Sequence, residues 1–262
     1  MTFITAIVAV VPIRAEASHQ SEMVSQLLFG ELAEITEGNP QLVTGSFVKI
    51  KTQFDGYEGW CQAAQLARVP EDLAAEFGSA ITADISNTME VNGTKVHLPF
   101  GVSLGLFRQQ QLKLQGYQFT YMGQSTVPEN NEFSSERVKE IASLFLNTPY
   151  LWGGRSMFGI DCSGFVQQVY RYFNIALPRD AYQQAELGSD IAFLAESKCG
   201  DLAFFDNPSG KITHVGILLS ESQIIHASGK VRIDSIDQAG VLNTDIGERT
   251  HSLRLIKRYS GK

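Results

Sequence analysis

The sequence changes character near residue 130, and this change limits what the chain can fold into. Before it, short apolar runs alternate with turn residues, and the dipeptides Asp55-Gly56 and Asn92-Gly93 stand between strand-like runs. Asp-Gly and Asn-Gly favour tight β-hairpins because both residues tolerate positive φ angles. The first half is therefore predicted to form small β structures, and its pattern indicates two related barrels without a visible sequence repeat.

The second half begins with two helical segments and ends in strands. Residues 134–147, "SSERVKEIASLFLN", carry apolar side chains at helical spacing, and Ser and Glu at the start suit a helix N-terminus. Residues 161–174, "DCSGFVQQVYRYFN", repeat the helical pattern. Strand-like segments follow from residue 201. Helices followed by a run of antiparallel strands predict the α+β fold class.

Length, composition and charge exclude several classes. A chain of 262 residues with 44% hydrophobic and 19% charged residues is predicted to be globular, with two or three domains. A net charge of −7 without a basic stripe argues against nucleic acid or an anionic membrane as partner. No Lys or Arg precedes the apolar run "FITAIVAVV", so it is predicted to be a folded strand and the protein cytoplasmic.

One of the three cysteines, Cys162, stands directly before a helical pattern. An odd number of cysteines suits a reducing compartment, where a free thiol is either a buried structural residue or a reactive group. A helix N-terminus and a nearby imidazolium both lower the pKa of a thiol. His214 and His226 lie on consecutive strand-like runs joined by "SES", and we expect them to lie opposite each other on one sheet face. The three residues could then supply a nucleophile, a base and an orienting group.

Structural alternatives exist for each of these residues. A cysteine at a helix start, or a histidine on a strand, is on its own more often part of the core, and "WGG" would ordinarily mark only a tight turn. The order of cysteine helix, histidine strand and polar strand favours papain-like chemistry instead. A zinc site built from Cys162, Cys199, His214 and His226 has no CxxC or HxxxH spacing to support it, so neither metal nor cofactor is predicted.

A family resemblance rests on motifs that occur in order. They are "TPYLWGGRSMFGIDCSGFVQQVYRYFNIALPRDAYQQ", "CGDLAFFDN", "ITHVGILL" and "IIHASG". Over about residues 133–262 they resemble the NlpC-type cysteine peptidases of bacterial peptidoglycan. The segments "SEMVSQLLFGE" and "DGYEGW" resemble the bacterial SH3-like domains fused to such peptidases. The whole chain resembles the γ-D-glutamyl-L-diamino-acid endopeptidases that carry two such domains.

The resemblance implies an architecture and an activity. SH3-like domains are expected at residues 1–67 and 68–128, and a papain-like catalytic domain at residues 129–262. The expected substrate is a peptidoglycan-derived stem peptide with a free N-terminal L-Ala, cut at its γ-D-glutamyl-L-diamino-acid bond during muropeptide recycling. A papain-like amidase or acyltransferase acting on another amide, and a non-catalytic wall-binding module, remain alternatives. The diamino acid and the oligomeric state stay open.

The resemblance also implies roles for individual residues. Cys162 would be the nucleophile, His214 the base, His226 the group that holds the base, and Tyr150 a neighbour of the thiol that helps to bind the oxyanion. The residues implied around the substrate are Glu22, Tyr57, Trp152, Asp161, Ser163 and Asp180. Of these, the carboxylates of Glu22 and Asp180 and the hydroxyl of Tyr57 would pair the substrate ammonium, since an unpaired buried charge is costly. Ala181 stands where many relatives have serine, which removes one possible hydroxyl contact.

Overall fold

The structure is a computed structural model, and it describes residues 2–259. Its contacts divide the chain into two compact units. The first takes in the chain up to Asn131 together with Trp152–Met157, and the second takes in Glu132–Leu151 and the chain from Phe158 onward. The polypeptide therefore passes between the units at three places.

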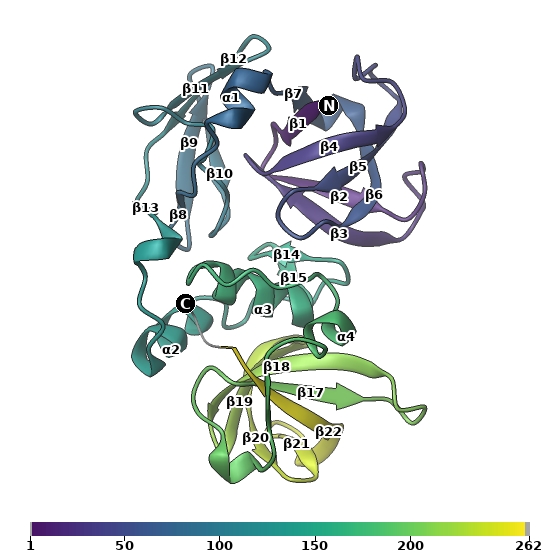
Figure 1. The fold of residues 1–262 in the computed structure, drawn as a ribbon, viewed down its shortest axis with the longest axis vertical. Helices are drawn as coiled ribbons and strands as arrows, with labels where there is room; N and C mark the ends of the chain where they lie inside the picture. Colours follow the sequence, from purple (N-terminus) through teal and green to yellow (C-terminus); the bar gives the residue numbers. More distant parts are fainter. Residues whose placement is uncertain (1, 260–262) are drawn as a thin grey trace. The chain divides into compact units, whose positions relative to one another are not determined.

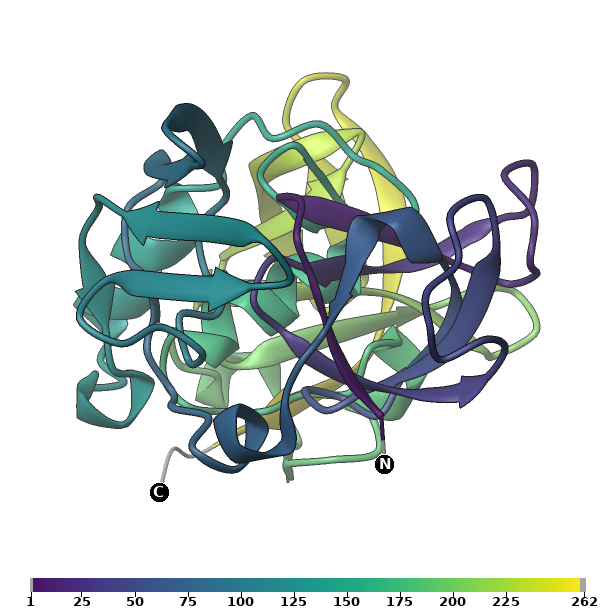
Figure 2. The ribbon, with the colours of Figure 1, turned by 90° about the horizontal axis from the view of Figure 1, so that it is seen from above.

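The first unit begins with a seven-stranded sheet in the order β3-β2-β6-β5-β4-β1-β7, drawn in purple to blue in Figures 1 and 2. Its strands are β1 (Phe3–Ala6), β2 (Val10–Arg14), β3 (Met23–Leu28), β4 (Leu32–Glu37), β5 (Phe47–Thr52), β6 (Glu58–Gln62) and β7 (Leu66–Arg68). The predicted hairpin at Asp55-Gly56 is confirmed, because β5 pairs antiparallel with β6 across it. Alternate side chains such as Val48 and Ile50 point into an apolar core.

A second set of strands completes this unit. They are β8 (Ile81–Thr82), β9 (Asn87–Val91), β10 (Thr94–Leu98), β11 (Gln111–Leu114), β12 (Tyr117–Tyr121) and β13 (Ser125–Thr126), with helix α1 (Glu71–Ala75) before them and β14 (Arg155–Ser156) later in the chain. The predicted Asn92-Gly93 hairpin is confirmed, with φ angles of 49° and 80°. β9–β12 form a four-stranded sheet rather than a closed barrel. A second SH3-like domain, and the three domain boundaries, therefore stay predictions.

The second unit has the predicted α+β layout. Its helices are α2 (Ser135–Ser143), α3 (Cys162–Arg171) and α4 (Ala181–Gln184). Its strands are β15 (Gly159–Ile160), β16 (Ser189–Ile191), β17 (Leu202–Asp206), β18 (Ile212–Ser220), β19 (Gln223–Ser228), β20 (Lys230–Asp237), β21 (Gly240–Asn243) and β22 (Glu248–Arg258). All but the first join one antiparallel sheet in the order β16-β22-β17-β18-β19-β20-β21, and β21 also pairs with β22. Both predicted helices exist but are shorter than their apolar patterns.

Helix α3 is the central element of this unit. Phe165, Val166 and Val169 are fully buried, and the helix packs on β18 and β19. The other face of the sheet covers a separate apolar cluster that includes Phe205, Leu218 and Ile236. Burial on both faces explains why β18 reads as a nearly continuous apolar run. Among residues 2–259, no helix has the length and apolar character needed to cross a membrane.

Candidate active site

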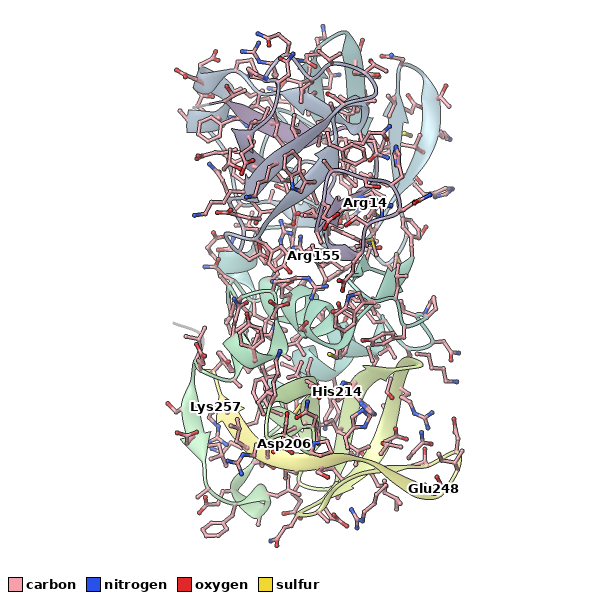
Figure 3. The ribbon with its side chains drawn as sticks, turned by 90° about the vertical axis from the view of Figure 1, so that its right-hand side faces the viewer. Arg14, Arg155, Asp206, His214, Glu248 and Lys257 are labelled. Atoms are coloured by element: carbon pink, nitrogen blue, oxygen red, sulfur yellow. The ribbon has the colours of Figure 1, made fainter. Side chains whose placement is uncertain are left out.

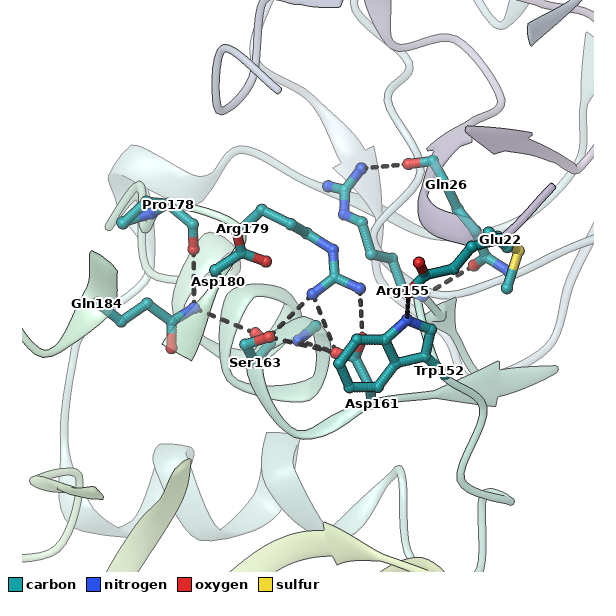
Figure 4. Close-up of polar contacts among 12 residues, drawn as sticks. Glu22, Gln26, Trp152, Arg155, Asp161, Ser163, Pro178, Arg179, Asp180 and Gln184 are labelled. Carbon is teal, nitrogen blue, oxygen red and sulfur yellow. Dashed lines mark hydrogen bonds and ion pairs between the residues drawn. The ribbon is translucent and has the colours of Figure 1, made fainter. Parts of the chain in front are cut away.

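Cys162 is the first residue of α3, and a buried network fixes this helix start. The carboxylate of Asp161 caps the helix by accepting a hydrogen bond from the N–H of Gly164, at 2.8 Å. Arg179 pairs with the same carboxylate, with Nη1 3.0 Å from Oδ1, and also donates to the hydroxyl of Ser163 (Figure 4). Asp161 and Ser163, both predicted near the substrate, thus lie beside Cys162 in contacts that hold the helix.

The electrostatic environment of Cys162 differs from the sequence-based expectation. We expected the helix N-terminus and an imidazole to lower its pKa. Burial, together with the charge of Asp161, instead raises the pKa of the thiol to about 12. The backbone N–H groups of Val215 and Ser163 and the charge of Arg179 act in the opposite direction. The thiol, 6% exposed, is therefore neutral in the free protein and lies against the β18 residue that follows His214.

His214 lies on β18 (Figure 3), and its predicted pairing with His226 is wrong by two residues. Gly216 is the residue that lies opposite His226, because a turn that closes at Ser220 and Gln223 sets the register. His214 and His226 are diagonal neighbours on one face, still close enough to touch. Gly216 makes this approach possible, since a Cβ there would lie 2.8 Å from the Cβ of His226.

A chain of hydrogen bonds runs from His214 into the sheet. Nε2 of His214 lies 2.8 Å from Nδ1 of His226, and Nε2 of His226 lies 3.0 Å from Oδ2 of Asp234. Arg232 donates to both oxygens of Asp234, at 2.8 and 2.9 Å. Both histidines and Asp234 are buried. Burial and the neighbouring imidazoles of His226 and His251 hold the pKa of His214 well below its usual range, so its ring is neutral.

A third histidine joins this cluster. His251, on β22, stacks on the ring of His214 and presents its edge to His226. The three imidazoles bring nitrogen atoms within 4.8 Å of one another, a spacing at which such groups can share a metal ion. However, the 2.8 Å separation between His214 and His226 is that of a hydrogen bond, whereas two nitrogens on one tetrahedral zinc lie roughly 3.3 Å apart. A shared proton accounts for the approach of these two rings.

Tyr150 also lies near the thiol. Burial, together with the neighbouring Cys162 and the carboxylate of Asp161, raises the pKa of its hydroxyl above the ordinary value. The hydroxyl is therefore protonated at neutral pH and can donate a hydrogen bond. The backbone N–H of Tyr150 donates to Gly229, which fixes the segment that carries it. The structure thus brings the predicted residues Tyr150 and Cys162 together within the second unit.

The predicted ammonium-binding residues are divided between the two units. Glu22 is exposed in the first unit, and its carboxylate accepts a 2.6 Å hydrogen bond from Nε1 of Trp152 (Figure 4). Tyr57 is half-buried in the same unit, where its backbone N–H donates to the Thr52 hydroxyl in the Asp55-Gly56 hairpin. Asp180 belongs to the second unit, as the N-cap of α4. The structure brings Glu22 into direct contact with Trp152, a residue predicted to lie near the substrate.

The segment that carries Trp152 is anchored by an ion pair that sequence reasoning missed. Arg155 and Glu31 are buried and form two hydrogen bonds, of 3.0 and 3.1 Å. Arg155 also donates to the carbonyl of Gln26 at 2.7 Å (Figure 4). Gly153 has a φ of +75°, and a Cβ there would lie 2.4 Å from the carbonyl oxygen of Met23. "WGG" is therefore more than a tight turn, because close approach to β3 requires its first glycine.

The fold and the placement of a cysteine at the start of the central helix define the class of protein. The second unit is a papain-like cysteine peptidase domain. Comparison with known families agrees: the NlpC/P60 family matches residues 147–250, and the bacterial dipeptidyl-peptidase SH3 domain matches residues 13–66. The chain belongs to the NlpC/P60 family of peptidoglycan endopeptidases.

Individual relatives extend over most of the chain. A γ-D-glutamyl-L-lysine dipeptidyl-peptidase of Bacillus subtilis (strain 168) is 30% identical over 213 residues, which are 78% of this chain and 71% of the relative. Dipeptidyl-peptidase 6 of Lysinibacillus sphaericus is 25% identical over 86% of this chain and 88% of its own length. The crystal structure of an NlpC/P60 family protein from Bacillus cereus ATCC 10987 has the same fold, with a TM-score of 0.78, 19% identity, and coverage of 98% of this chain and 99% of that chain.

Proposed function

We propose that this protein is a cysteine endopeptidase that cuts the γ-D-glutamyl-L-diamino-acid bond of peptidoglycan stem peptides with a free N-terminal L-Ala. The observation that carries the proposal is the placement of Cys162 at the start of α3, next to the backbone of Val215, together with the buried His214–His226 pair that begins one residue earlier on the same strand. The names of two relatives, both dipeptidyl-peptidases, support release of a dipeptide. A role in muropeptide recycling and a cytoplasmic location stay predictions.

In the proposed mechanism, the proton of the Cys162 thiol passes to Nδ1 of His214 as the sulfur attacks the γ-carbonyl carbon of D-Glu. This transfer creates the thiolate and the imidazolium together, and their attraction offsets the burial that disfavours each charge alone. The N–H groups of Val215 and Ser163 stabilise the thiolate. The tetrahedral oxyanion would be bound by the Tyr150 hydroxyl and the backbone N–H of Cys162.

Collapse of this intermediate completes the reaction. His214 returns its proton to the departing amine of the diamino acid, which leaves L-Ala-γ-D-Glu joined to Cys162 as a thioester. A water molecule then attacks the thioester carbonyl, His214 takes one of its protons, and the dipeptide leaves as the thiol is restored.

A dipeptidyl-peptidase must also position its substrate so that the bond cut is the one after the second residue from the N-terminus. We propose that Glu22 and Tyr57 of the first unit pair the ammonium of L-Ala, and the role of Asp180 stays a prediction. The hydrogen bond from Trp152 holds the Glu22 carboxylate in one orientation while the carboxylate stays exposed to solvent and thus to a ligand. An N-acetylated peptide lacks the positive charge and would lose this pairing.

The test of the proposed function compares three cysteine variants on L-Ala-γ-D-Glu-L-Lys and the matching diaminopimelate tripeptide, with release of L-Ala-γ-D-Glu as the readout. Cys162→Ala should abolish release. Cys61→Ala and Cys199→Ala are matched controls, because Cys61 is fully buried in the first unit and the Cys199 thiol donates to the carbonyl of Ser135. Unchanged release by Cys162→Ala would reject the mechanism. Cleavage of another amide alone would favour the amidase or acyltransferase alternative.

A further inference from the structure

The buried carboxylate of Asp234 has no role in the mechanism above, yet it ends the hydrogen-bond chain that starts at His214. We infer that Asp234 is a positioning residue that selects which nitrogen of His214 can accept the thiol proton. The inference rests on the proposed function of Cys162 and His214 and adds to it the group that sets the tautomers of both histidines.

The inference begins from what surrounds Asp234. Its Oδ1 accepts hydrogen bonds from Nη2 of Arg232 and from the backbone N–H and hydroxyl of Thr244, each at 2.9 Å. Its Oδ2 accepts from Nε of Arg232 at 2.8 Å and faces Nε2 of His226 at 3.0 Å. Burial raises the pKa of Asp234, but the hydrogen bonds from His226, Arg232 and Thr244 together outweigh it and hold this pKa well below its usual range. Asp234 is therefore an ionised carboxylate, which can only accept hydrogen bonds.

The protonation states then follow step by step. Because Asp234 can only accept, Nε2 of His226 must carry a hydrogen. A neutral His226 then has a bare Nδ1, which accepts the hydrogen on Nε2 of His214 across 2.8 Å. A neutral His214 with its hydrogen on Nε2 has a bare Nδ1. This nitrogen is free to take a proton, and the mechanism needs such a base beside the thiol.

Other polar and charged groups around the histidines do not determine which ring nitrogens carry a hydrogen. Arg232, whose Nη1 lies 2.9 Å from Asp245, donates its Nε and Nη2 hydrogens to Asp234. His251 stacks on His214 through its ring face, and its own Nδ1 lies 2.9 Å from the hydroxyl of Thr250. Of these groups, Asp234 is the one that is hydrogen-bonded to a ring nitrogen of His226 and, through His226, linked to Nε2 of His214.

Asp234→Asn is the informative variant because it keeps the shape and changes the hydrogen bonding. The amide oxygen is expected at the Oδ1 position, where three donors converge, so the amide NH2 faces Nε2 of His226. His226 would then carry its hydrogen on Nδ1 and donate it to His214. His214 would in turn carry its hydrogen on Nδ1, where it can no longer accept the thiol proton.

The experiment measures the second-order rate of Cys162 alkylation by iodoacetamide from pH 5 to 9, a readout that needs no peptide substrate. Peptide turnover is measured beside it. Asp234→Asn should lower the alkylation rate at pH 7 and reduce kcat by roughly 10²- to 10⁴-fold, with KM nearly unchanged. The matched control is Asp237→Asn on the same strand: this exposed aspartate also pairs with an arginine, Arg249, and within residues 2–259 it has no hydrogen bond to a histidine. It should react like the wild type.

Nitrogen-15 NMR of the histidine rings in the wild-type protein supplies a reading that does not depend on the variant folding. The wild-type protein should show His226 with its hydrogen on Nε2, and Asp234→Asn should show it on Nδ1. A wild-type His226 protonated on Nδ1, or an Asp234→Asn protein that alkylates and turns over at the wild-type rate, would overturn the inference. Fast wild-type alkylation that Asp234→Asn slows, with no cleavage of either tripeptide, would instead reject the proposed function and leave the inference standing.

Discussion

His251 lies flat against His214, with ring centroids 4.1 Å apart and 25° between the ring planes. The two residues come from β22 and β18, which are not neighbours in the sheet order. An aromatic ring stacked in this way restricts rotation of the His214 imidazole about its Cβ–Cγ bond.

The first prediction concerns this stack. His251→Ala should lower kcat/KM by about fivefold, because a stacked aromatic pair contributes about 1 kcal/mol beyond its buried area. His251→Phe restores a flat ring and should recover most of the loss. Steady-state kinetics of the two variants at pH 7.5 provide the measurement. Equal losses of kcat/KM in both variants would contradict the idea that stacking of a flat ring on His214 supports catalysis.

The second prediction concerns stability at low pH. Burial lowers the pKa of His214 well below its usual range and that of His251 to about 4. Both groups bind protons more readily in the unfolded chain, so their contribution to stability is complete above about pH 6.5 and is lost as the pH falls below it. For each histidine, the free energy of unfolding should decrease by up to about 1.4 kcal/mol per pH unit.

Urea unfolding between pH 7.5 and 4.5 tests this dependence. His251→Phe should remove about half of the slope, since one of the two titrating rings is gone. The ionised carboxylates of Asp234 and Asp237 act in a separate, lower window, because their pKa values are lowered and their contribution is lost only as the pH falls below about 4. A flat stability profile down to pH 5 would contradict the assignment of neutral buried histidines.

The third prediction concerns the buried pair of Glu31 and Arg155. Glu31→Gln leaves the guanidinium buried without its counter-charge and should reduce the free energy of unfolding of the first unit by about 3–5 kcal/mol. Glu37→Gln is the matched control, because Glu37 pairs with Lys49 at 2.9 Å on the surface and should cost less than about 1 kcal/mol. Urea unfolding of both variants gives the comparison.

The fourth prediction concerns the substrate ammonium. Glu22→Gln keeps an oxygen for the hydrogen bond from Trp152 but removes the negative charge, so kcat/KM for L-Ala-γ-D-Glu-L-Lys should fall by at least about tenfold. The N-acetylated peptide should show no such difference between the two enzymes. Glu16→Gln alters a nearby exposed carboxylate of the first unit and should match the wild type. An identical loss on both peptides would remove Glu22 from ammonium recognition.

The sequence predicted those parts of the fold that depend on the conformational preferences of a few adjacent residues. Asp55-Gly56 and Asn92-Gly93 were sufficient to place two hairpins: both φ angles are positive in the two-residue turn Asn92-Gly93, and Gly56 has a positive φ in the longer connection between β5 and β6. The run "FITAIVAVV" is predicted to form one strand, but the structure divides it between β1 and β2. β1 and β2 lie in one sheet but are not neighbours in it, so the chain bends between them, and no local signal in the apolar run marks where.

The candidate site was predictable only in part. The cysteine, its helix and the two histidines carried recognisable motifs, whereas Asp234 and His251 did not. Asp234 reaches His226 because β19 and β20 pair in a register that sets Arg232 opposite His226, and such pairing depends on the whole sheet. The burial that raises the pKa of Cys162 is likewise a property of the packed unit and has no counterpart in the order of residues.

The division of the chain into two units limits how N-terminal units can be exchanged between relatives. Trp152–Met157 is encoded within the peptidase domain but is held by Glu31 and Gln26 of the N-terminal unit. An exchange of N-terminal units between relatives would therefore succeed only if the matching six-residue segment travelled with it. The two genetic modules of this enzyme are not separable at a single point in the gene.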